Sequence, residues 1–341
     1  MKNFFYIFFF LICISCSKEH TERQLENPVN DSPWINVEKP YPTGENGLFP
    51  LIKSPKFKAV NSFTNLSNDD KVAMVSFNGK VKVYPYLYVN RSEIVNDNIG
   101  DYYFAISYCP QTKSAINYNR IVQNDTLNLV ASGYLYKDNM VPSDENYQMY
   151  WSQMMMKGIT NNAHSKRIKT FNTIETTWKT VLEHYPNADV FYYDGPIITP
   201  RVPINTFSEK SNTEIQNSDF VFAIIENLND SGKDKLTHAY PLKGFSDITE
   251  FKDFIIDGKP SMLIGNKQKH FFSSFFTPKD LTFKLVNQDF PPTIKDNEGN
   301  IWNAFGYAFE GPRKGTQLES TKSYIASWWA WKDFFKNIEI K

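Results

Sequence analysis

Residues 94–118 read IVNDNIGDYYFAISYCPQTKSAINY, and this stretch sets the interpretation of the rest of the chain. Side chains alternate from Tyr102 to Cys109 with the period of a β-strand. Pro110 has no N–H and cannot continue a central strand, so Cys109 is expected at the strand's C-terminal end. The polar run 111–114 predicts a loop, and a partner strand is expected at 127–136, after turn residues 123–125.

The flanking sequence predicts a hairpin and two helices. Asn78-Gly79 separates the alternating segments 72–77 and 81–89, which is a strong indication of a β-hairpin. Residues 173–185 place apolar side chains on one helical face, and Pro186 follows, so a helix is predicted there. A second helix is predicted at 324–335, where aromatic residues recur at helical spacing.

The second half of the sequence repeats features of the first in the same order. Segments 72–77, 81–86, 94–97, 104–108 and 150–153 correspond to 220–225, 237–242, 255–258, 261–265 and 301–304. Several ordered matches indicate an internal duplication. The predicted fold class is therefore α+β and β-rich, with lobes at about 50–195 and 196–341 related by a pseudo-twofold axis. The aromatic C-terminal helix is expected to close the cleft between them.

The composition is that of a folded protein without a surface for nucleic acid. Of 341 residues, 41% are hydrophobic and 16% aromatic, and 37 basic side chains balance 37 acidic ones. This balance provides no electrostatic footprint for nucleic acid. The sequence has no Gly-rich phosphate loop, no G-x-S-x-G and no H-E-x-x-H, and its five histidines lack ligand spacing. No cofactor and no metal site are therefore predicted.

The N-terminus has the features of a lipoprotein signal peptide. Lys2 precedes an apolar core too short to span a bilayer, and Cys13-Ile14-Ser15-Cys16 resembles a bacterial lipobox, although Leu is usual where Cys13 stands. We expect a signal peptide at 1–15, acylated Cys16 and a polar tether within 16–32, and one domain at 33–341. The domain would lie outside the cytoplasm, lipid-anchored in the cell envelope at the outer membrane. Ordinary secretion with cleavage near Ser15 is the alternative.

Processing at Cys16 would leave Cys109 as the one remaining thiol. One interpretation is a reactive thiol beside a loop, with Lys113 close enough to favour the thiolate. The other is an inert side chain, because an unpaired cysteine is usually buried and behaves as a small hydrophobic residue. The sequence leaves both interpretations open.

Four runs carry a resemblance to a known family: VYPYLYVNRSEIVND, YCPQTKSA, SGYLYKDN with YWSQ, and WNAFGYAFEGP. From about Trp34 to its end, the chain resembles the bacterial family called domain of unknown function 3179. Many members carry Cys-Pro-x-Cys-Gly-Ser-Ala, and some are named as possible selenoproteins, which implies chemistry of a reactive chalcogen. Cys109 occupies the first cysteine, whereas Thr112 stands at the second and Ser92 at the family's histidine. The resemblance thus implies a thiol without its resolving cysteine or its nearest base.

Two functions are compatible with these features, and whether the protein is an enzyme stays open. In the first, an envelope protein uses its thiol for redox chemistry or thiol binding, through Cys109, Lys113, Glu93 and Asp97. In the second, a lipoprotein with a degenerate thiol site binds a glycan, another small molecule or a protein partner, through Trp151, Gln153, Trp302 and Asn303.

Overall fold

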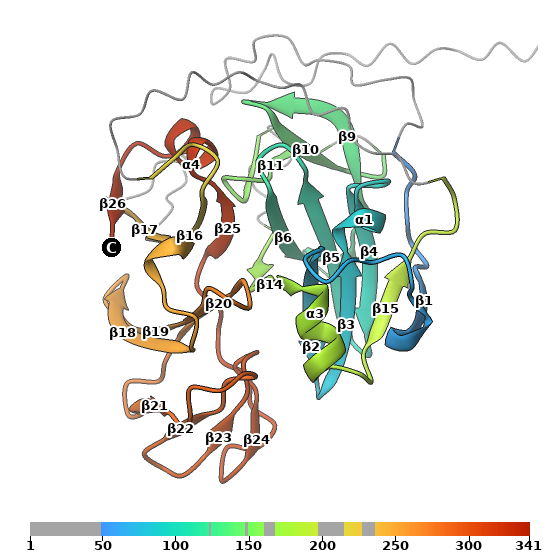
Figure 1. Ribbon diagram of the computed structural model, residues 1–341. Helices are drawn as coiled ribbons and strands as arrows, with labels where there is room; N and C mark the ends of the chain where they lie inside the picture. The colour runs from blue at the N-terminus through green and yellow to red at the C-terminus, as the bar shows by residue number, and fades with distance from the viewer. Residues whose placement is uncertain (1–48, 123, 147–148, 160–167, 197–214, 227–235) are drawn as a thin grey trace, which may run out of the picture.

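The computed structural model describes residues 49–122, 124–146, 149–159, 168–196, 215–226 and 236–341. Strands predominate in these ranges and the helices are short, as predicted for a β-rich α+β protein. Figure 1 shows the strands gathered into two groups, which we call the N-terminal half (49–196) and the C-terminal half (215–341). The predicted signal peptide, Cys16 and the tether lie outside the described residues.

The N-terminal half contains two main sheets. The larger has the order β1 (Lys56–Ala59), β15 (Asp189–Tyr192), β3 (Lys80–Pro85), β2 (Lys71–Phe77) and β14 (Ile174–Thr177). The other has the order β13 (Thr170–Phe171), β6 (Ser114–Asn119), β5 (Tyr102–Cys109) and β4 (Ile94–Ile99). Tyr84 of the first sheet and Phe104 and Ile106 of the second meet in one hydrophobic core, so the sheets pack face to face.

Short elements connect these strands. They are η1 (Val60–Ser62), α1 (Tyr86–Val89), β7 (Ile121–Val122), β8 (Asp125–Thr126), β9 (Leu129–Tyr136), β10 (Asn139–Asp144), β11 (Trp151–Ser152), β12 (Lys157–Gly158) and α3 (Trp178–His184). The β9–β10 hairpin reaches the C-terminal half, because Lys137 Nζ donates to the carbonyl of Asp333 and the rings of Tyr136 and Phe334 lie 5.5 Å apart.

The C-terminal half contains three sheets. The first has the order β25 (Ser323–Ser327), β16 (Phe220–Glu226), β17 (Leu236–Pro241) and β26 (Ile338–Ile340), and the second β18 (Glu250–Ile256), β19 (Lys259–Asn266) and β20 (Phe271–Phe276). The third has the order β21 (Phe283–Leu285), β22 (Ile294–Asp296), β23 (Ile301–Trp302) and β24 (Ala308–Glu310). The turn η2 (Leu242–Gly244) follows β17, and α4 (Trp328–Phe334) follows β25.

The two halves share a strand order. The strand order β15-β3-β2-β14 in one half matches the order β26-β17-β16-β25 in the other. In both orders the first two strands are parallel, and each later pair of neighbours is antiparallel. The antiparallel meanders β4-β5-β6 and β18-β19-β20 also match. The turns before β6 and β20 each contain a residue with positive φ, 53° at Lys113 and 51° at His270. Two residues, one in each half, are called equivalent when they occupy the same place in these matched strands and in the turns that connect them.

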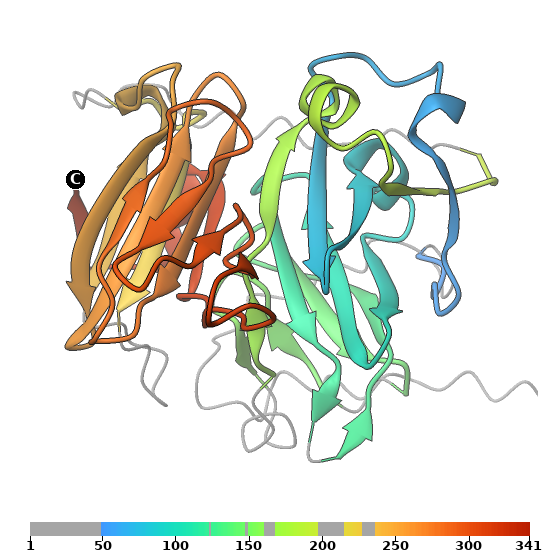
Figure 2. The ribbon, with the colours of Figure 1, turned by 90° about the horizontal axis from the view of Figure 1, so that it is seen from below.

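The halves are joined by two hydrophobic clusters. In one, Cys109 and Ile116 of the N-terminal half pack with Val221 and Tyr324 of the C-terminal half. In the other, Met74 and Trp178 of the N-terminal half pack with Ile264 and Phe271 of the C-terminal half, among others. Figure 2 shows the two groups of strands side by side. Each meander therefore buries one face within its own half and the opposite face against the other half.

The hairpin prediction is confirmed. β2 and β3 pair from Phe77 and Lys80 outward, and Asn78 and Gly79 both have positive φ, as a primed turn requires. The strand ends at Pro85, however, and residues 86–89 form α1. Cys109 is the last residue of β5, as expected. The partner predicted for this region was wrong, because β9 pairs with β10 and β5 pairs with β4 and β6.

Both predicted helices begin later than expected. Residues 174–177 and 323–327 are the strands β14 and β25, and helices occupy only 178–184 and 328–334. These residues are strands because they pair with β2 and β16. A strand that is buried on both faces has no alternation of apolar and polar side chains, so the sequence does not reveal it. The match of 94–97 with 255–258 was also wrong, since Ile94 begins β4 whereas Ile256 ends β18.

Candidate functional site

Cys109 lies at the interface of the two halves and is closed to solvent. It ends β5, is 1% exposed, and belongs to the cluster that includes Val221 and Tyr324 of the C-terminal half. The following turn contacts that half directly, since the N–H of Ser327 donates to the carbonyl of Thr112 at 2.9 Å. The thiol is therefore held between packed elements, without an exposed approach.

The sulfur is a hydrogen-bond acceptor. The N–H of Met140 donates to Sγ at 3.4 Å, and Thr112 hydrogen-bonds to Sγ through both its side chain and its backbone. Thr112 Oγ1 in turn lies 2.8 Å from Ser114 Oγ and accepts from Asn139 Nδ2 at 2.9 Å. The family's second cysteine position, Thr112, is thus in direct contact with the first.

Gln153 is the centre of the polar network behind the thiol. Its Oε1 accepts from Ser114 Oγ at 2.8 Å and from Asn139 Nδ2 at 2.7 Å, and its Nε2 donates to Ser107 Oγ at 2.8 Å. None of these side chains is more than 1% exposed. A buried polar network is stable only when its members satisfy one another, so removal of one member leaves several groups unpaired.

Glu93 is the carboxyl group that affects the thiol. Burial raises the pKa of Glu93 to about 8, and burial together with the charge of Glu93 raises the pKa of Cys109. Glu93 has a positive φ of 55°, at the junction between α1 and β4. Both groups are therefore protonated at neutral pH, and the thiolate is disfavoured.

Asp97 and Lys113, the other two predicted catalytic residues, do not join this arrangement. Asp97 lies opposite Phe104 in the β4–β5 register, about 16 Å along β5 from Cys109 at the usual rise per residue. Its Oδ2 accepts from Lys82 Nζ at 2.6 Å and Tyr84 Oη at 2.5 Å. Lys113 is exposed at the tip of the turn. Of the predicted partners, only Glu93 acts on the thiol.

The four predicted binding residues have structural contacts instead. Trp151 and Trp302 are each 1% exposed, and Gln153 is engaged in the network behind Cys109. Asn303 Oδ1 accepts from the N–H groups of Phe305 and Tyr307 and so shapes a turn. In the described chain, neither indole offers a face to an incoming ligand.

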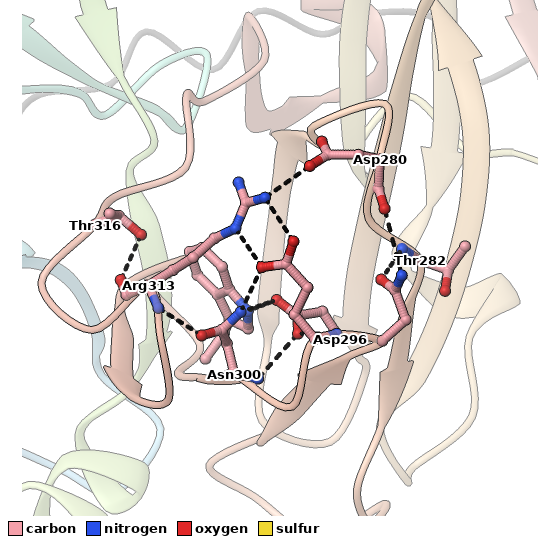
Figure 3. A network of polar contacts seen from close by, with 9 residues as sticks. Asp280, Thr282, Asp296, Asn300, Arg313 and Thr316 are labelled. Carbon is pink, nitrogen blue, oxygen red and sulfur yellow. Dashed lines mark hydrogen bonds and ion pairs between the residues drawn. The ribbon is translucent and has the colours of Figure 1, made fainter.

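Trp302 hydrogen-bonds to Asp296, one of the residues labelled in the polar network of Figure 3. Asp296 Oδ2 accepts from Trp302 Nε1 at 2.9 Å and from Asn300 Nδ2 at 2.8 Å. Burial acts to raise the pKa of Asp296, but the hydrogen bonds from Asn300 and Trp302 lower it overall. Arg313 binds Glu298 and Asp280 at 2.7 Å each. The run WNAFGYAFEGP therefore lies in a cross-linked structural unit.

A buried carboxyl group that sequence reasoning had not linked to a site lies on the other face of β5. Glu175 Oε2 accepts from Tyr86 Oη at 2.6 Å, and the Tyr86 ring stacks on Tyr108 at 3.8 Å. Burial raises the pKa of Glu175 to about 8, although Tyr86 and Lys71 act to lower it. The sequence placed Glu175 in a helix and so gave no indication of this contact.

A cavity of about 820 Å³ lies between the halves. From the N-terminal half it is lined by Met74, Val75, Ser76, Phe77, Tyr102, Asn117, residues 156–158, residues 168–172 and Ile174. From the C-terminal half it is lined by Ile225, Asp257, Lys259, Phe276, Phe305, residues 317–320 and Lys322. These residues come from distant segments, so no local motif could have predicted them. None of the sequence-predicted site residues and no residue of α4 is among those described as lining it.

The described residues contain neither a cluster of metal ligands nor a helix that could span a membrane. No group of three or more His, Cys, Asp or Glu side chains in the described part of the chain could hold a metal ion. No helix within those ranges is long and apolar enough to cross a membrane.

Comparison with known proteins identifies the family. A family model matches residues 46–338, which is most of the chain, so the protein belongs to a family whose function is not established. That family is described as "Protein of unknown function (DUF3179)", and the resemblance expected from the four sequence runs is thereby confirmed. No curated protein and no solved structure matches the chain.

Proposed function

We propose that this protein is a ligand-binding protein of the cell envelope that holds a small molecule in the cavity between its halves. The observation that carries the proposal is the cavity of about 820 Å³, which is within the range usual for small-molecule sites and lies between two packed units, where such sites are frequent. It combines half-buried aromatic rings with polar and charged side chains from both halves.

The state of the thiol supports binding over catalysis. A cysteine nucleophile needs the thiolate and access to its substrate. Cys109 is 1% exposed, and burial together with Glu93 raises its pKa. A substrate could reach Cys109 only if the packed elements around it moved apart, whereas the cavity needs no such movement to admit a ligand.

Blocking the cavity tests the proposal. The full chain, purified in mild detergent, would be screened by thermal shift against neutral and acidic oligosaccharides, dipeptides and nucleotides. We expect at least one class to raise the melting temperature, and Ser76→Trp, which fills the cavity from β2, to abolish that increase. Thr126→Trp is the matched control, because Thr126 is exposed on β8 and does not line the cavity. Ligand stabilisation that persists in Ser76→Trp would contradict the proposed location.

The anchor is a separate part of the proposal. The lipobox-like run ending at Cys16 supports an acylated N-terminus that holds the domain at a membrane. Cys16→Ala should abolish labelling by a fatty-acid analogue and move the protein from the membrane fraction to the soluble fraction. Persistent acyl labelling of this variant would disprove the lipobox interpretation.

A thiol function is the second candidate, and the polar network favours it. Buried polar side chains cost free energy to maintain, and this network includes Thr112, the family's second cysteine position, which is in contact with Cys109. Thr112→Cys should restore a cysteine pair, because the Thr112 side chain already hydrogen-bonds to Sγ. We expect mild oxidation to yield a disulfide between residues 109 and 112, detected by non-reducing peptide mapping. A variant that retains both thiols under oxidant would remove the support for this candidate.

We also infer that the halves arose by duplication of one ancestral unit. The shared strand order supports this, and so do the reciprocal contacts between halves. Ser327 donates its N–H to the Thr112 carbonyl, and the hydroxyl of Thr176 donates to the Lys269 carbonyl at 2.6 Å. In a crystal structure of the protein, the Cα traces around Pro85 and Pro241 should superpose together with the meanders that follow. Divergent traces there would refute the inference.

A further inference from the structure

The chemistry of the lining residues restricts the class of ligand that the cavity between the halves would bind. We propose that this cavity binds an acidic oligosaccharide, with sugar rings on the aromatic wall and carboxylates at the lysine rim. This inference rests on the proposed ligand-binding function and adds the substrate class to it.

The aromatic wall comes from both sheets of the N-terminal half. Phe77 and Tyr102 stack with ring centroids 4.9 Å apart and planes 8° from parallel, and Tyr102 contacts Phe171 at 4.7 Å. All three rings are partly exposed and line the cavity. The C–H faces of a pyranose ring are apolar and flat enough to pack on such rings, as apolar ligand surfaces do in other sites.

Charge at the rim favours an anion. Among the lining residues that the structure describes, two carboxylates, Asp257 and Glu319, stand against four lysines, Lys157, Lys169, Lys259 and Lys322. They come from four different segments of both halves, and Lys259 Nζ also lies 4.8 Å from the centroid of the Phe276 ring. Among the described lining residues there is no arginine, the side chain best suited to a concentrated phosphate group. Separated lysines instead match negative charges spaced along a chain.

Asn117 provides an unoccupied acceptor inside the cavity. Its side chain is 0% exposed and lines the cavity, and its Nδ2 donates weakly to Tyr102 Oη at 3.5 Å. Its Oδ1 is buried and has no hydrogen-bond partner among the described residues. A buried carbonyl without a donor is unfavourable, and a ligand hydroxyl would satisfy it. Sugars carry such donors on every ring.

The test is titration calorimetry on the full chain, purified in mild detergent, with three probes. Trigalacturonate is the acidic oligosaccharide, cellotriose the neutral one of similar size, and ATP the compact polyanion. We expect trigalacturonate to bind at least about tenfold more tightly than either of the others, and its affinity to fall as salt is raised. Tighter binding of ATP would overturn the proposal in favour of a phosphate ligand. Equal binding of cellotriose would remove the acidic class while leaving the proposed ligand-binding function in place.

Substitutions of lining residues test whether trigalacturonate binds in the cavity. Lys169→Ala combined with Lys259→Ala should weaken trigalacturonate binding about tenfold or more, whereas Lys284→Ala with Lys295→Ala, the same charge change on exposed strands away from the cavity, should not. Asn117→Leu should weaken binding with little change in melting temperature, because it removes an unpaired carbonyl and only the weak 3.5 Å hydrogen bond to Tyr102 Oη. Unchanged affinity in both cavity variants would overturn the proposal. Failure of all three probes, with other compounds still stabilising the protein in a Ser76-dependent manner, would disprove the substrate class alone.

Discussion

The ends of β5 and β19 occupy equivalent positions in the two halves, yet buried polar side chains lie near the first at positions where the second has apolar ones. Ser107 and Ser114 near Cys109 are equivalent to Ile264 and Phe271, and Gln153 corresponds to Ala304 in the sequence match of 150–153 with 301–304. Ile264, Phe271 and Ala304 share one hydrophobic cluster. On the opposite face, the hydrogen-bonded pair Tyr86 and Glu175 is equivalent to Leu242 and Ile325. The shared strand arrangement therefore forms in the C-terminal half without these polar groups.

The turn that follows each strand shows what the two regions have in common. Asn266, which is equivalent to Cys109, accepts the N–H of Lys269 through its Oδ1 at 2.9 Å. Cys109 accepts a backbone hydrogen bond from Thr112, the residue equivalent to Lys269. The side chain at this position caps the turn in both halves. The sulfur of Cys109 thus has a structural role that needs no reactivity.

The largest expected effect comes from removing the centre of the polar network. Gln153→Ala leaves partners on Ser107, Ser114 and Asn139 unsatisfied and should lower the free energy of unfolding by roughly 3–5 kcal/mol. Urea denaturation followed by fluorescence would measure it. Adding Ser107→Ile and Ser114→Phe introduces the residue types found at the equivalent positions of the C-terminal half. These two substitutions should recover part of the lost free energy of unfolding. A triple variant less stable than Gln153→Ala would show that the two regions are not interchangeable.

The second effect depends on pH and concerns Glu175. Burial raises the pKa of Glu175 to about 8 in the folded protein, against about 4.3 when unfolded, so the folded state holds the proton more tightly. Its contribution to stability is complete below the unfolded pKa and is lost as pH rises through about 8, a loss on the order of a few kcal/mol. Lys71 of β2, Tyr86 of α1 and Tyr108 of β5 are the titratable groups around it.

Glu175→Gln should therefore reduce the loss of stability between about pH 5 and pH 9, measured by urea denaturation at each pH. The slope should not vanish, because burial also raises the pKa of Glu93 to about 8. Glu183→Gln is the control, since Glu183 lies on the helix surface. An identical pH profile for Glu175→Gln and the wild-type protein would argue against a protonated Glu175.

Thiol labelling compares the two equivalent positions directly. Cys109 in the wild type and the cysteine of Asn266→Cys, both almost fully buried sites, should react with iodoacetamide at least about tenfold more slowly than the exposed cysteine of Thr126→Cys. Peptide mapping after quenching gives the rate at each residue. Labelling of Cys109 at the rate of the exposed control would restore the reactive interpretation.

The smallest expected effect concerns the hydrogen bond by which Cys109 or Asn266 caps the turn that follows its strand. Cys109→Ala removes the acceptor and should cost about 1 kcal/mol beyond the loss of packing, whereas Cys109→Asn provides the acceptor found in the other half. Asn266→Ala should cost more, because it also removes the hydrogen bond that Asn266 Nδ2 donates to Thr249 Oγ1 at 3.3 Å. Melting temperatures of the three variants are the measurement, and Cys109→Asn falling below Cys109→Ala would exclude a shared capping role.

The sequence predicted correctly those features that depend on a few neighbouring residues. Asn78-Gly79 requires positive φ, and Pro110 cannot extend a strand, so the hairpin and the position of Cys109 were predicted correctly. Residues 174–177 and 323–327 were assigned to helices because strands buried on both faces lose their alternation. The cavity and the contacts of Gln153 and Glu175 depend on segments that are far apart in the chain, which no spacing rule reports.

The two clusters that join the halves have a consequence for folding. Each half leaves one face of its meander apolar until the other half covers it. The same holds for one face of the shared four-strand arrangement, β15-β3-β2-β14 or β26-β17-β16-β25. A fragment ending near residue 196 would expose both faces, so unfolding should be a single cooperative transition of the whole domain. If the halves descend from one ancestor, that ancestor could bury these faces only against a second copy of itself. A twofold-symmetric homodimer would then have preceded the fused chain, and fusion would have freed one half to acquire the buried polar groups that the other lacks.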